Sequence, residues 1–336
     1  MPAMCLLPVD RCGCSLKNST GAQVVKALEL SGVTPENGVV CHASRRRGMT
    51  DQETWTTLRI LTWTKEYFGA RGIENARLEA EWLLCAATGL DRVGLYLNYD
   101  KPLNREELSA FRQMVARRAR REPLQHILGS QEFCGLEFAV SPDVLIPRHD
   151  TETLVEEALR RAPLARTVLD IGTGSGCIAV SLARRLPGAR IVASDISAVA
   201  LEMARANARA NGVDVEFLHG SLLEPVAGRC FDLIVSNPPY IPSADIQLLE
   251  PEVRDGDPRL ALDGGPDGLD IYRRLIPASL EHLEPGGWLL LEVGMGQAQD
   301  VAEMFPLADG YGQVVSSPDP GGIERVVGAA RKVELT

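Results

Sequence analysis

The feature that most constrains the fold is a short apolar run that ends in a glycine-rich turn, Val168-Leu169-Asp170-Ile171-Gly172-Thr173-Gly174-Ser175-Gly176. A strand that runs through such a turn into a helix is typical of a parallel sheet, and the glycines let a ligand approach backbone N–H groups closely. The spacing is G-x-G-x-G, and Cys177 stands where the dinucleotide fingerprint has its third glycine. The turn also lacks the Gly-Lys-Ser/Thr of a P-loop. These differences disfavour a dinucleotide or P-loop nucleotide site.

From Thr151 on, strands and helices alternate regularly. We expect strands at residues 167–171, 190–195, 213–218, 231–236 and 287–293, and helices at residues 175–186 and 197–211. Ser197 suits the N-cap of the second helix and Gly212 its end. Two late runs, Gln313 to Ser316 and Ile323 to Ala329, are expected to close the sheet as an antiparallel pair. The pattern predicts an α/β fold with a mostly parallel sheet covered on both faces.

Helical periodicity precedes the sheet, from residue 50 to residue 125. One apolar stripe consists of Trp55, Leu58, Leu61 and Phe68, and a second of Leu78, Trp82, Leu83 and Cys85. We interpret the basic run Arg117 to Arg121 as a solvated helix end whose charge suits the helix dipole. Residues 126–147 then predict a β-hairpin linker around Gly135, which assigns residues 148–336 to the α/β domain.

Residues 1–49 are set apart from the rest. They lack the apolar core of a secretory signal and contain Asp10, Glu29 and Glu36, which a mitochondrial presequence would avoid. We interpret them as a disordered extension or as the result of a start codon assigned too early, since domain-like sequence begins at Met49. The motif Cys12-Gly13-Cys14 is a weak metal signal without a matching second pair, so no metal site is expected.

Charge is distributed unevenly over the 336 residues: residues 1–49 carry +3, residues 50–130 carry +1 and residues 131–336 carry −14. Residues 131–336 are too acidic to match the negatively charged backbone of a nucleic acid. We therefore expect no direct nucleic-acid binding and favour a protein or small-molecule substrate. No run of 18 apolar residues exists, so no membrane span is expected. The cysteines in the body of the chain sit singly in apolar patterns, which favours core positions in a reducing cytoplasm.

Asp195 ends the expected strand after the glycine turn, 25 residues beyond Asp170. A carboxylate at the tip of that strand can accept both hydroxyl protons of a ribose. The alternative is that Asp195 only caps the following helix. We favour the ribose role because the turn and the acid are spaced as a nucleoside site requires, and the G-x-G-x-G spacing resembles the S-adenosylmethionine (AdoMet) site of class I methyltransferases.

The most specific motif is Ser236-Asn237-Pro238-Pro239-Tyr240, at the end of the strand at 231–236. Two consecutive prolines fix the backbone and remove two donors, which leaves carbonyl groups available as acceptors. A planar NH₂ group can then donate to the Asn237 side-chain oxygen and to the Pro238 carbonyl, while Tyr240 packs against its plane. Such a site suits an amide or an exocyclic amine. An ordinary proline-rich loop is the alternative.

With these motifs the chain resembles the HemK/PrmC family, the glutamine methyltransferases that act on the Gly-Gly-Gln loop of peptide chain release factors. The similarity runs from about Thr50 to the C-terminus. Further matching stretches are Glu122 to Gly129, Val144 to Arg148, Thr151-Glu152, Val235 to Ile241, Ala261 to Leu269 and Gly322 to Val327. The chain departs from the family at His126, where Tyr is usual, and at His149-Asp150, which replaces Pro-Glu.

The resemblance implies a class I AdoMet-dependent methyltransferase with AdoMet as cofactor and release factors as partners. It implies that the helical domain at 50–125 docks the substrate and that 148–336 is the catalytic domain. The AdoMet-binding residues it implies are Asp170, Gly172, Thr173, Gly174, Ser175 and Gly176 at the methionine part, Asp195 at the ribose, Leu222 near the adenine, and Asn237. His219 to Leu222 lacks the acidic and bulky pair that is common near the adenine.

For the substrate side, the resemblance implies that Asn237, Pro238 and Tyr240 are catalytic. Together with Pro239 they would hold the glutamine amide, and Arg148 and Glu152 would shape the site. A simple i,i+4 helix bridge between Arg148 and Glu152 is the alternative for that pair. In the expected reaction the amide nitrogen attacks the methyl group on the sulfonium, and no metal and no strong general base are needed.

Three alternatives stay open at this level. A glutamine methyltransferase for a ribosomal protein shares fold, cofactor and tetrapeptide, but Ile146 to Glu152 looks more like the release-factor branch. Asn-Pro-Pro-Tyr also admits a nucleic-acid adenine methyltransferase, which the charge of −14 and the lack of a basic recognition domain disfavour. A non-enzymatic AdoMet-binding protein is disfavoured by the intact tetrapeptide.

Overall fold

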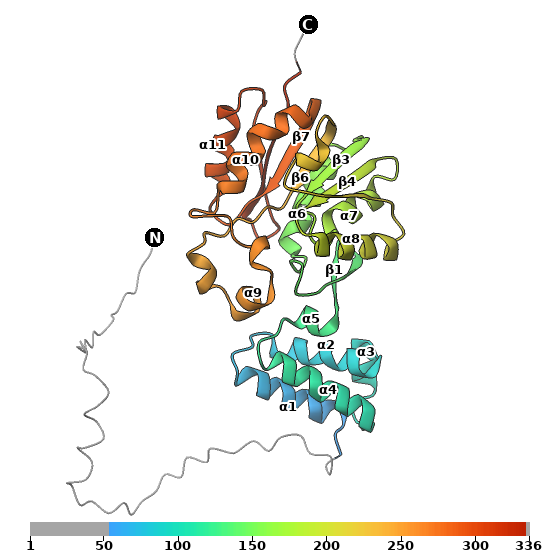
Figure 1. Ribbon diagram of the computed structural model, residues 1–336. Helices are drawn as coiled ribbons and strands as arrows, with labels where there is room; N and C mark the ends of the chain where they lie inside the picture. The colour runs from blue at the N-terminus through green and yellow to red at the C-terminus, as the bar shows by residue number, and fades with distance from the viewer. Residues whose placement is uncertain (1–53, 334–336) are drawn as a thin grey trace, which may run out of the picture. The chain divides into compact units, whose positions relative to one another are not determined.

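The computed structural model describes residues 54–333. The expected extension at 1–49, with its Cys-Gly-Cys motif, lies outside this range. The described part contains a group of helices, a two-stranded hairpin and a seven-stranded sheet (Figure 1).

The seven-stranded sheet has the strand order β5-β4-β3-β6-β7-β9-β8. Its strands are β3 (Thr167–Ile171), β4 (Arg190–Asp195), β5 (Glu216–His219), β6 (Phe231–Ser236), β7 (Leu283–Glu292), β8 (Val315–Pro318) and β9 (Glu324–Ala330). Strands β3 to β7 run parallel, and β9 is antiparallel to both β7 and β8. The expected mostly parallel sheet closed by an antiparallel pair is therefore confirmed.

Helices cover both faces of this sheet (Figure 1). One apolar cluster joins Val168 to α6 (His149–Arg161), α7 (Cys177–Arg185) and α8 (Ala198–Ala210), and a second joins Leu169 to α10 (Asp270–Ser279) and α11 (Ala298–Leu307). Neighbouring residues of β3 thus point into opposite clusters, as alternation along a strand requires. The expected core position holds for the buried Cys177, but it is wrong for the exposed Cys230.

The helical region consists of α1 (Thr57–Gly69), α2 (Ala76–Thr88), α3 (Arg92–Leu97), α4 (Arg105–Arg118) and α5 (Leu124–Leu128). The expected stripes are partly wrong, because Leu58 is 56% exposed and Trp82 is 39% exposed. Phe68 of the first stripe is buried as expected, and α1 also buries Thr57, Ile60 and Thr64. Thr57 and Thr64 are polar residues, so a pattern based on apolar residues alone does not identify this buried face. The hairpin of β1 (Ser130–Phe133) and β2 (Leu136–Ala139) follows, as expected.

Between β6 and α10 the chain forms a long excursion with short elements η2 (Asp245–Leu248), α9 (Pro251–Gly256) and η3 (Arg259–Ala261). Helix α9 packs against the residue that precedes α5, because a Cβ atom on Gly256 would lie 2.4 Å from Pro123 Cγ. Only glycine permits so close an approach.

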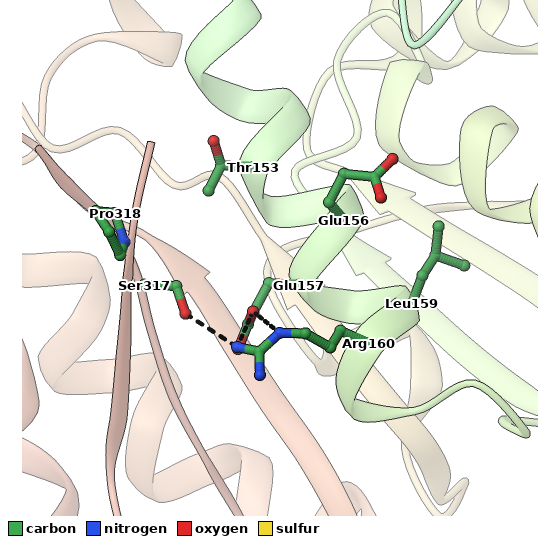
Figure 2. A pocket seen from close by; sticks show the side chains of 7 residues that line it. All are labelled: Thr153, Glu156, Glu157, Leu159, Arg160, Ser317 and Pro318. Carbon is green, nitrogen blue, oxygen red and sulfur yellow. Dashed lines mark hydrogen bonds and ion pairs between the residues drawn. The ribbon is translucent and has the colours of Figure 1, made fainter. Parts of the chain in front are cut away.

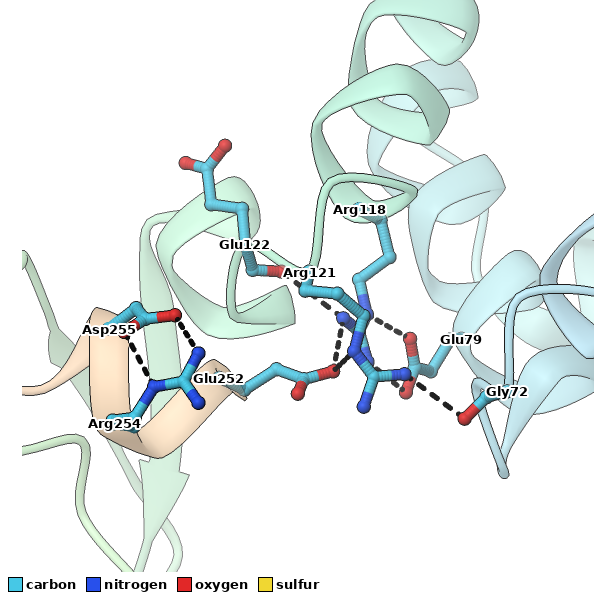
Figure 3. A network of polar contacts seen from close by, with 8 residues as sticks. All are labelled: Gly72, Glu79, Arg118, Arg121, Glu122, Glu252, Arg254 and Asp255. Atoms are coloured by element: carbon cyan, nitrogen blue, oxygen red, sulfur yellow. Dashed lines mark hydrogen bonds and ion pairs between the residues drawn. The ribbon is translucent and has the colours of Figure 1, made fainter. Parts of the chain in front are cut away.

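A polar network connects the helical region to this excursion (Figure 3). Arg118 is 5% exposed, and its guanidinium pairs with Glu79 of α2 and, at 2.7 Å, with Glu252 of α9. Arg121 Nε lies 3.0 Å from Glu252, and its Nη1 donates to the Gly72 carbonyl oxygen. The interpretation of this basic run as a solvated helix end is therefore wrong for Arg118, since carboxylates from two other helices enclose it.

Candidate active site

The glycine turn follows β3 and is tied to β4. The Gly172 N–H donates to the Ser194 carbonyl oxygen at 2.8 Å. Gly172, Gly174 and Gly176 have φ angles of 73°, 55° and 84°, in the left-handed region that favours glycine. At Gly176 space is also restricted, since an added Cβ would lie 3.0 Å from Ala204 Cβ on α8. The turn therefore needs its glycines for backbone conformation and, at Gly176, for helix packing.

Asp170 is fully buried in β3, two residues before Gly172. Its Oδ2 accepts hydrogen bonds from the Thr173 hydroxyl at 2.6 Å and from the Ala179 N–H at 3.2 Å. Its Oδ1 is buried and has no hydrogen-bond partner. Burial, together with a smaller effect of the nearby Asp195 charge, raises the pKa of Asp170 to about 7. A buried carboxylate oxygen without a partner favours a donor or a cationic group of a ligand.

Asp195 ends β4 and is 9% exposed. Its two carboxylate oxygens accept the Gly174 N–H and the Ser197 N–H, both at 2.8 Å. The following helix is capped by Ser197, whose Oγ accepts the Ala200 N–H at 3.2 Å. Capping of α8 therefore does not account for Asp195. Each carboxylate oxygen retains a second lone pair that could accept a ribose hydroxyl proton. The ribose role itself stays a prediction.

Leu222, the expected neighbour of the adenine, has a φ angle of +48°. A left-handed conformation is costly for a residue with a branched side chain and is often found at functional sites. Its carbonyl oxygen accepts a hydrogen bond from the Ser194 hydroxyl at 3.3 Å, so it lies beside the end of β4. The contact with adenine itself stays a prediction.

Asn237 follows β6, and its side chain is oriented by α6. The Asn237 Nδ2 group donates to Thr151 Oγ1 at 3.1 Å. Because the amide nitrogen is used in this way, the Asn237 Oδ1 atom is the end of the side chain that can accept from a substrate. The register pairs Ile171 with Ser236 and Ser236 with Leu291, so the carboxyl ends of β3, β6 and β7 lie at one edge of the sheet.

Tyr240 closes the tetrapeptide and packs against the segment after β7. A Cβ on Gly294 would lie 3.0 Å from Tyr240 Cδ2, and the Gln297 side-chain amide donates to the Tyr240 carbonyl oxygen at 2.9 Å. Burial raises the pKa of the Tyr240 hydroxyl to about 12, so this group stays protonated at neutral pH. At Gly264 an added Cβ would lie 2.8 Å from the Pro239 carbonyl oxygen, which shows how closely the excursion folds over the tetrapeptide.

Arg148 and Glu152 do not pair with each other, so the i,i+4 bridge is wrong. Arg148 forms an ion pair with Asp257, whose Oδ1 also accepts the Ile146 N–H at 3.3 Å. Glu152 Oε1 accepts the Cys134 N–H at 3.0 Å. Both residues therefore hold the segment that enters α6, Arg148 against the excursion and Glu152 against the hairpin. A contact of either with substrate stays a prediction.

Glu292 is a site residue that the sequence interpretation missed. It is the last residue of β7 and is 1% exposed. Burial raises its pKa to about 7 against the opposing effects of the Thr151 side chain and Arg325. Its Oε2 atom is buried without a hydrogen-bond partner. The available signal was an acid that interrupts an otherwise apolar strand. Thr151 and Asp257 were also not predicted to bind other site residues.

A hollow lined by Thr153, Glu156, Glu157, Leu159, Arg160, Ser317 and Pro318 includes none of these groups (Figure 2). Its buried acid, Glu157, is paired with Arg160 and Arg161. Among residues 54–333 there is no cluster of three or more His, Cys, Asp or Glu that could hold a metal ion. In the same range no helix is long and apolar enough to cross a membrane.

Two family models match the chain: the PrmC N-terminal domain at residues 59–129 and the methyltransferase small domain at residues 149–265. The chain is 61% identical over 276 residues to the release factor glutamine methyltransferase of Geobacter sulfurreducens, covering 82% of this chain and 97% of the relative. This chain belongs to the release factor glutamine methyltransferase family. The relative of that name from Moorella thermoacetica is 46% identical over 269 residues, covering 79% of this chain and 95% of the relative.

The family fold is shared more widely. The hMettl16 catalytic domain, solved in complex with MAT2A 3′UTR hairpin 1, is 16% identical with a TM-score of 0.50 and covers 66% of this chain and 82% of that one. At this identity the likeness concerns the fold alone. The expected methyltransferase fold of this family member is thus confirmed.

Proposed function

We propose that this chain methylates the side-chain amide nitrogen of the glutamine in the Gly-Gly-Gln motif of peptide chain release factors, with AdoMet as methyl donor, in the cytoplasm. The observation that carries the proposal is the orientation of Asn237. Its Nδ2 is engaged by Thr151, so its Oδ1 and the Pro238 carbonyl oxygen can accept the two N–H protons of one amide. The names of the relatives support a release factor as the protein that supplies this amide.

The residues around the glycine turn fit AdoMet. Asp170 and Asp195 border the turn with two carboxylates, and one oxygen of Asp170 is buried without a partner. A ligand with a sulfonium and an ammonium group is cationic and suits this negative surrounding. We assign Gly172 to Gly176 to the methionine part, Asp195 to the ribose and Leu222 to the adenine. When bound, AdoMet supplies an electrophilic methyl group on sulfur.

Asn237, Pro238 and Tyr240 would activate the amide. A neutral amide nitrogen is a poor nucleophile because its lone pair is delocalised into the carbonyl group. Acceptance of both N–H protons by Asn237 Oδ1 and the Pro238 carbonyl increases electron density on the nitrogen and fixes its direction of attack. Tyr240, whose backbone is held by Gln297, packs against the amide plane. The proton leaves for solvent after transfer, so no strong base is required.

The helical domain at 50–125 would supply a second contact with the release factor. A Gly-Gly-Gln loop is short and offers little area for binding. Helix α3 and the turn after it expose apolar side chains, with Val93 64%, Leu97 77% and Tyr99 55% exposed. A contact at this surface would raise the effective concentration of the loop at Asn237.

The test is a transfer assay with methyl-labelled AdoMet and three substrates: purified release factor, ribosomal proteins and DNA. We expect label in the release factor alone, and we expect it to vanish when the glutamine of the Gly-Gly-Gln motif is replaced by alanine. Label in a ribosomal protein or in DNA, with none in the release factor, would refute the proposed substrate.

A further inference from the structure

Glu292 lies where β7 and β6 end side by side, since Ser236 pairs with Leu291 in the sheet register. Its backbone is fixed by the Tyr272 hydroxyl, which donates to the Glu292 carbonyl oxygen at 2.7 Å. Its side chain is almost completely buried. Burying a carboxyl group costs free energy of folding. A buried Glu292 beside the tetrapeptide Asn237 to Tyr240 is therefore expected to serve a function.

Thr151 connects Glu292 to Asn237. The Thr151 Oγ1 atom accepts from Asn237 Nδ2 at 3.1 Å. The Thr151 and Asn237 side chains both act to lower the pKa of the neighbouring Glu292, whose Oε2 atom is buried without a hydrogen-bond partner. A threonine hydroxyl has one proton, whereas an ionised carboxylate can only accept. When the Thr151 hydroxyl gives its proton to the unpartnered Glu292 Oε2 atom, the Thr151 oxygen is left as an acceptor for the Asn237 NH₂ group.

We propose that Glu292 is a positioning residue that acts through Thr151 to hold the Asn237 amide with its Oδ1 atom toward the substrate. This inference rests on the proposed function of the same site. If the carboxylate were replaced by a group that can donate, Thr151 could turn its proton toward Asn237. The Asn237 side chain could then flip and present NH₂ to the substrate NH₂, which repels the amide instead of accepting from it.

Charged and titratable groups surround Glu292 from several elements. Arg325 of β9 favours the ionised form and is itself paired with Asp150 of α6 at 2.7 Å, while Asp150 disfavours that form. The hydroxyls of Tyr240 and Tyr272 stay protonated at neutral pH, because burial raises both pKa values. Cys177 also faces this charge, and burial raises its pKa. Glu292 is therefore the group of this set that gains a proton as the pH falls through about 7.

The test compares Glu292→Gln, which keeps the shape but can donate, with Thr151→Val and Thr151→Ser. We expect kcat to fall by ~10-fold to ~100-fold in Glu292→Gln and Thr151→Val, because a misdirected amide loses alignment. Thr151→Ser keeps the hydroxyl and should lose much less. The affinity for AdoMet should change by less than about twofold in all three, since none donates to the glycine turn.

Two further readouts separate positioning from general damage. The kcat of the wild type should decline below pH 7, and this decline should be absent in Glu292→Gln. The Asn237 side-chain NH₂ resonances should titrate with the same midpoint in the wild type and not in the variant, a measurement that needs no substrate. The double variant Glu292→Gln/Thr151→Val should be no slower than the slower single variant.

A Glu292→Gln enzyme with wild-type kcat, or fully additive losses in the double variant, would overturn the proposed positioning of Asn237 by Glu292 through Thr151. If Glu292→Gln fails to fold, the contrast between Thr151→Val and Thr151→Ser and the wild-type NMR titration decide the question. The two proposals fail differently. If the wild type labels no release factor, the proposed substrate is wrong. If the wild type is active and Glu292→Gln leaves kcat unchanged, only the positioning role is wrong.

Discussion

The backbone N–H of Gly174 donates to Oδ2 of Asp195 across 2.8 Å. This hydrogen bond ties the glycine turn after β3 to the end of β4, although 21 residues separate the two positions. Asp195 therefore shapes the turn, and the ribose contact that we propose would use its remaining lone pairs. On this proposal the Asp195 side chain is needed both to form the turn and to bind the cofactor.

Replacement of Asp195 by alanine should weaken AdoMet binding by about 100-fold, because charge-assisted hydrogen bonds to the ribose disappear. Isothermal titration calorimetry measures this directly. Ser197→Ala is the matched control, since it removes the cap of α8 and should cost about 1 kcal/mol of stability with little loss of affinity. Unchanged cofactor affinity in Asp195→Ala would remove the ribose assignment.

Asn237→Ala should reduce turnover on release factor by about 10²-fold to 10³-fold, equivalent to about 2–4 kcal/mol of barrier. AdoMet affinity should change much less, because the lost oxygen is the atom that we propose accepts from the substrate amide. Single-turnover kinetics and calorimetry separate the two effects. Equal losses of binding and turnover would contradict the assigned role.

The affinity for AdoMet should rise with pH up to about 7 and then level off, since Asp170 carries a proton below that pH in the free protein. A cationic ligand favours the ionised form, so the proton must leave on binding, at a cost of up to about tenfold in affinity per pH unit. Calorimetry in two buffers of different ionisation enthalpy detects the released proton. Asp170→Asn should bind weakly at every pH and release none. A wild type with pH-independent affinity would show that Asp170 does not face the cation.

Arg118→Ala should destabilise the protein by about 3–5 kcal/mol, because it leaves Glu79 and Glu252 near each other without their shared counter-charge. Denaturant unfolding followed by circular dichroism gives the free energy of unfolding. Arg120→Ala is the control, since Arg120 is exposed on the same basic run. If both variants lost the same small amount, the buried network would contribute nothing specific.

Leu97→Asp should raise the KM for intact release factor by about tenfold, the effect expected of one apolar residue at an interface. The kcat/KM for a short Gly-Gly-Gln peptide should stay unchanged, because such a peptide lacks the part of the release factor that would dock on the helical domain. Leu164→Asp is a matched control, since Leu164 is 89% exposed outside the helical domain. Equal KM values for the two variants would argue against docking at α3.

The central strands were predictable because parallel strands buried on both faces are apolar along their length. Expected and observed bounds agree for β3, β4 and β6. The strand β5 begins three residues later than expected, at Glu216. It lies at the sheet edge, where burial constrains the sequence less.

The polar partners of the site could not be predicted in this way. Thr151 binds Asn237, 86 positions away, and Arg148 binds Asp257, 109 positions away. Motif spacing indicates which residues share the carboxyl end of the sheet, but it contains no information on which side chain turns toward which. Glu292 was visible only as an interruption in an apolar run, and its meaning depends on the neighbours that the fold brings to it.

The pairing of Arg118 with Glu252 bears on how enzymes of this family can be recombined. Glu252 lies on the excursion that follows the Asn237 to Tyr240 tetrapeptide, whereas Arg118 and Arg121 belong to the helical domain. A chimera that joins the helical domain of one relative to the catalytic domain of another inherits half of this charge pattern from each parent. Such an exchange should succeed only between parents that carry both signs at matching places, so substrate preference and catalytic competence would have to be inherited as one unit.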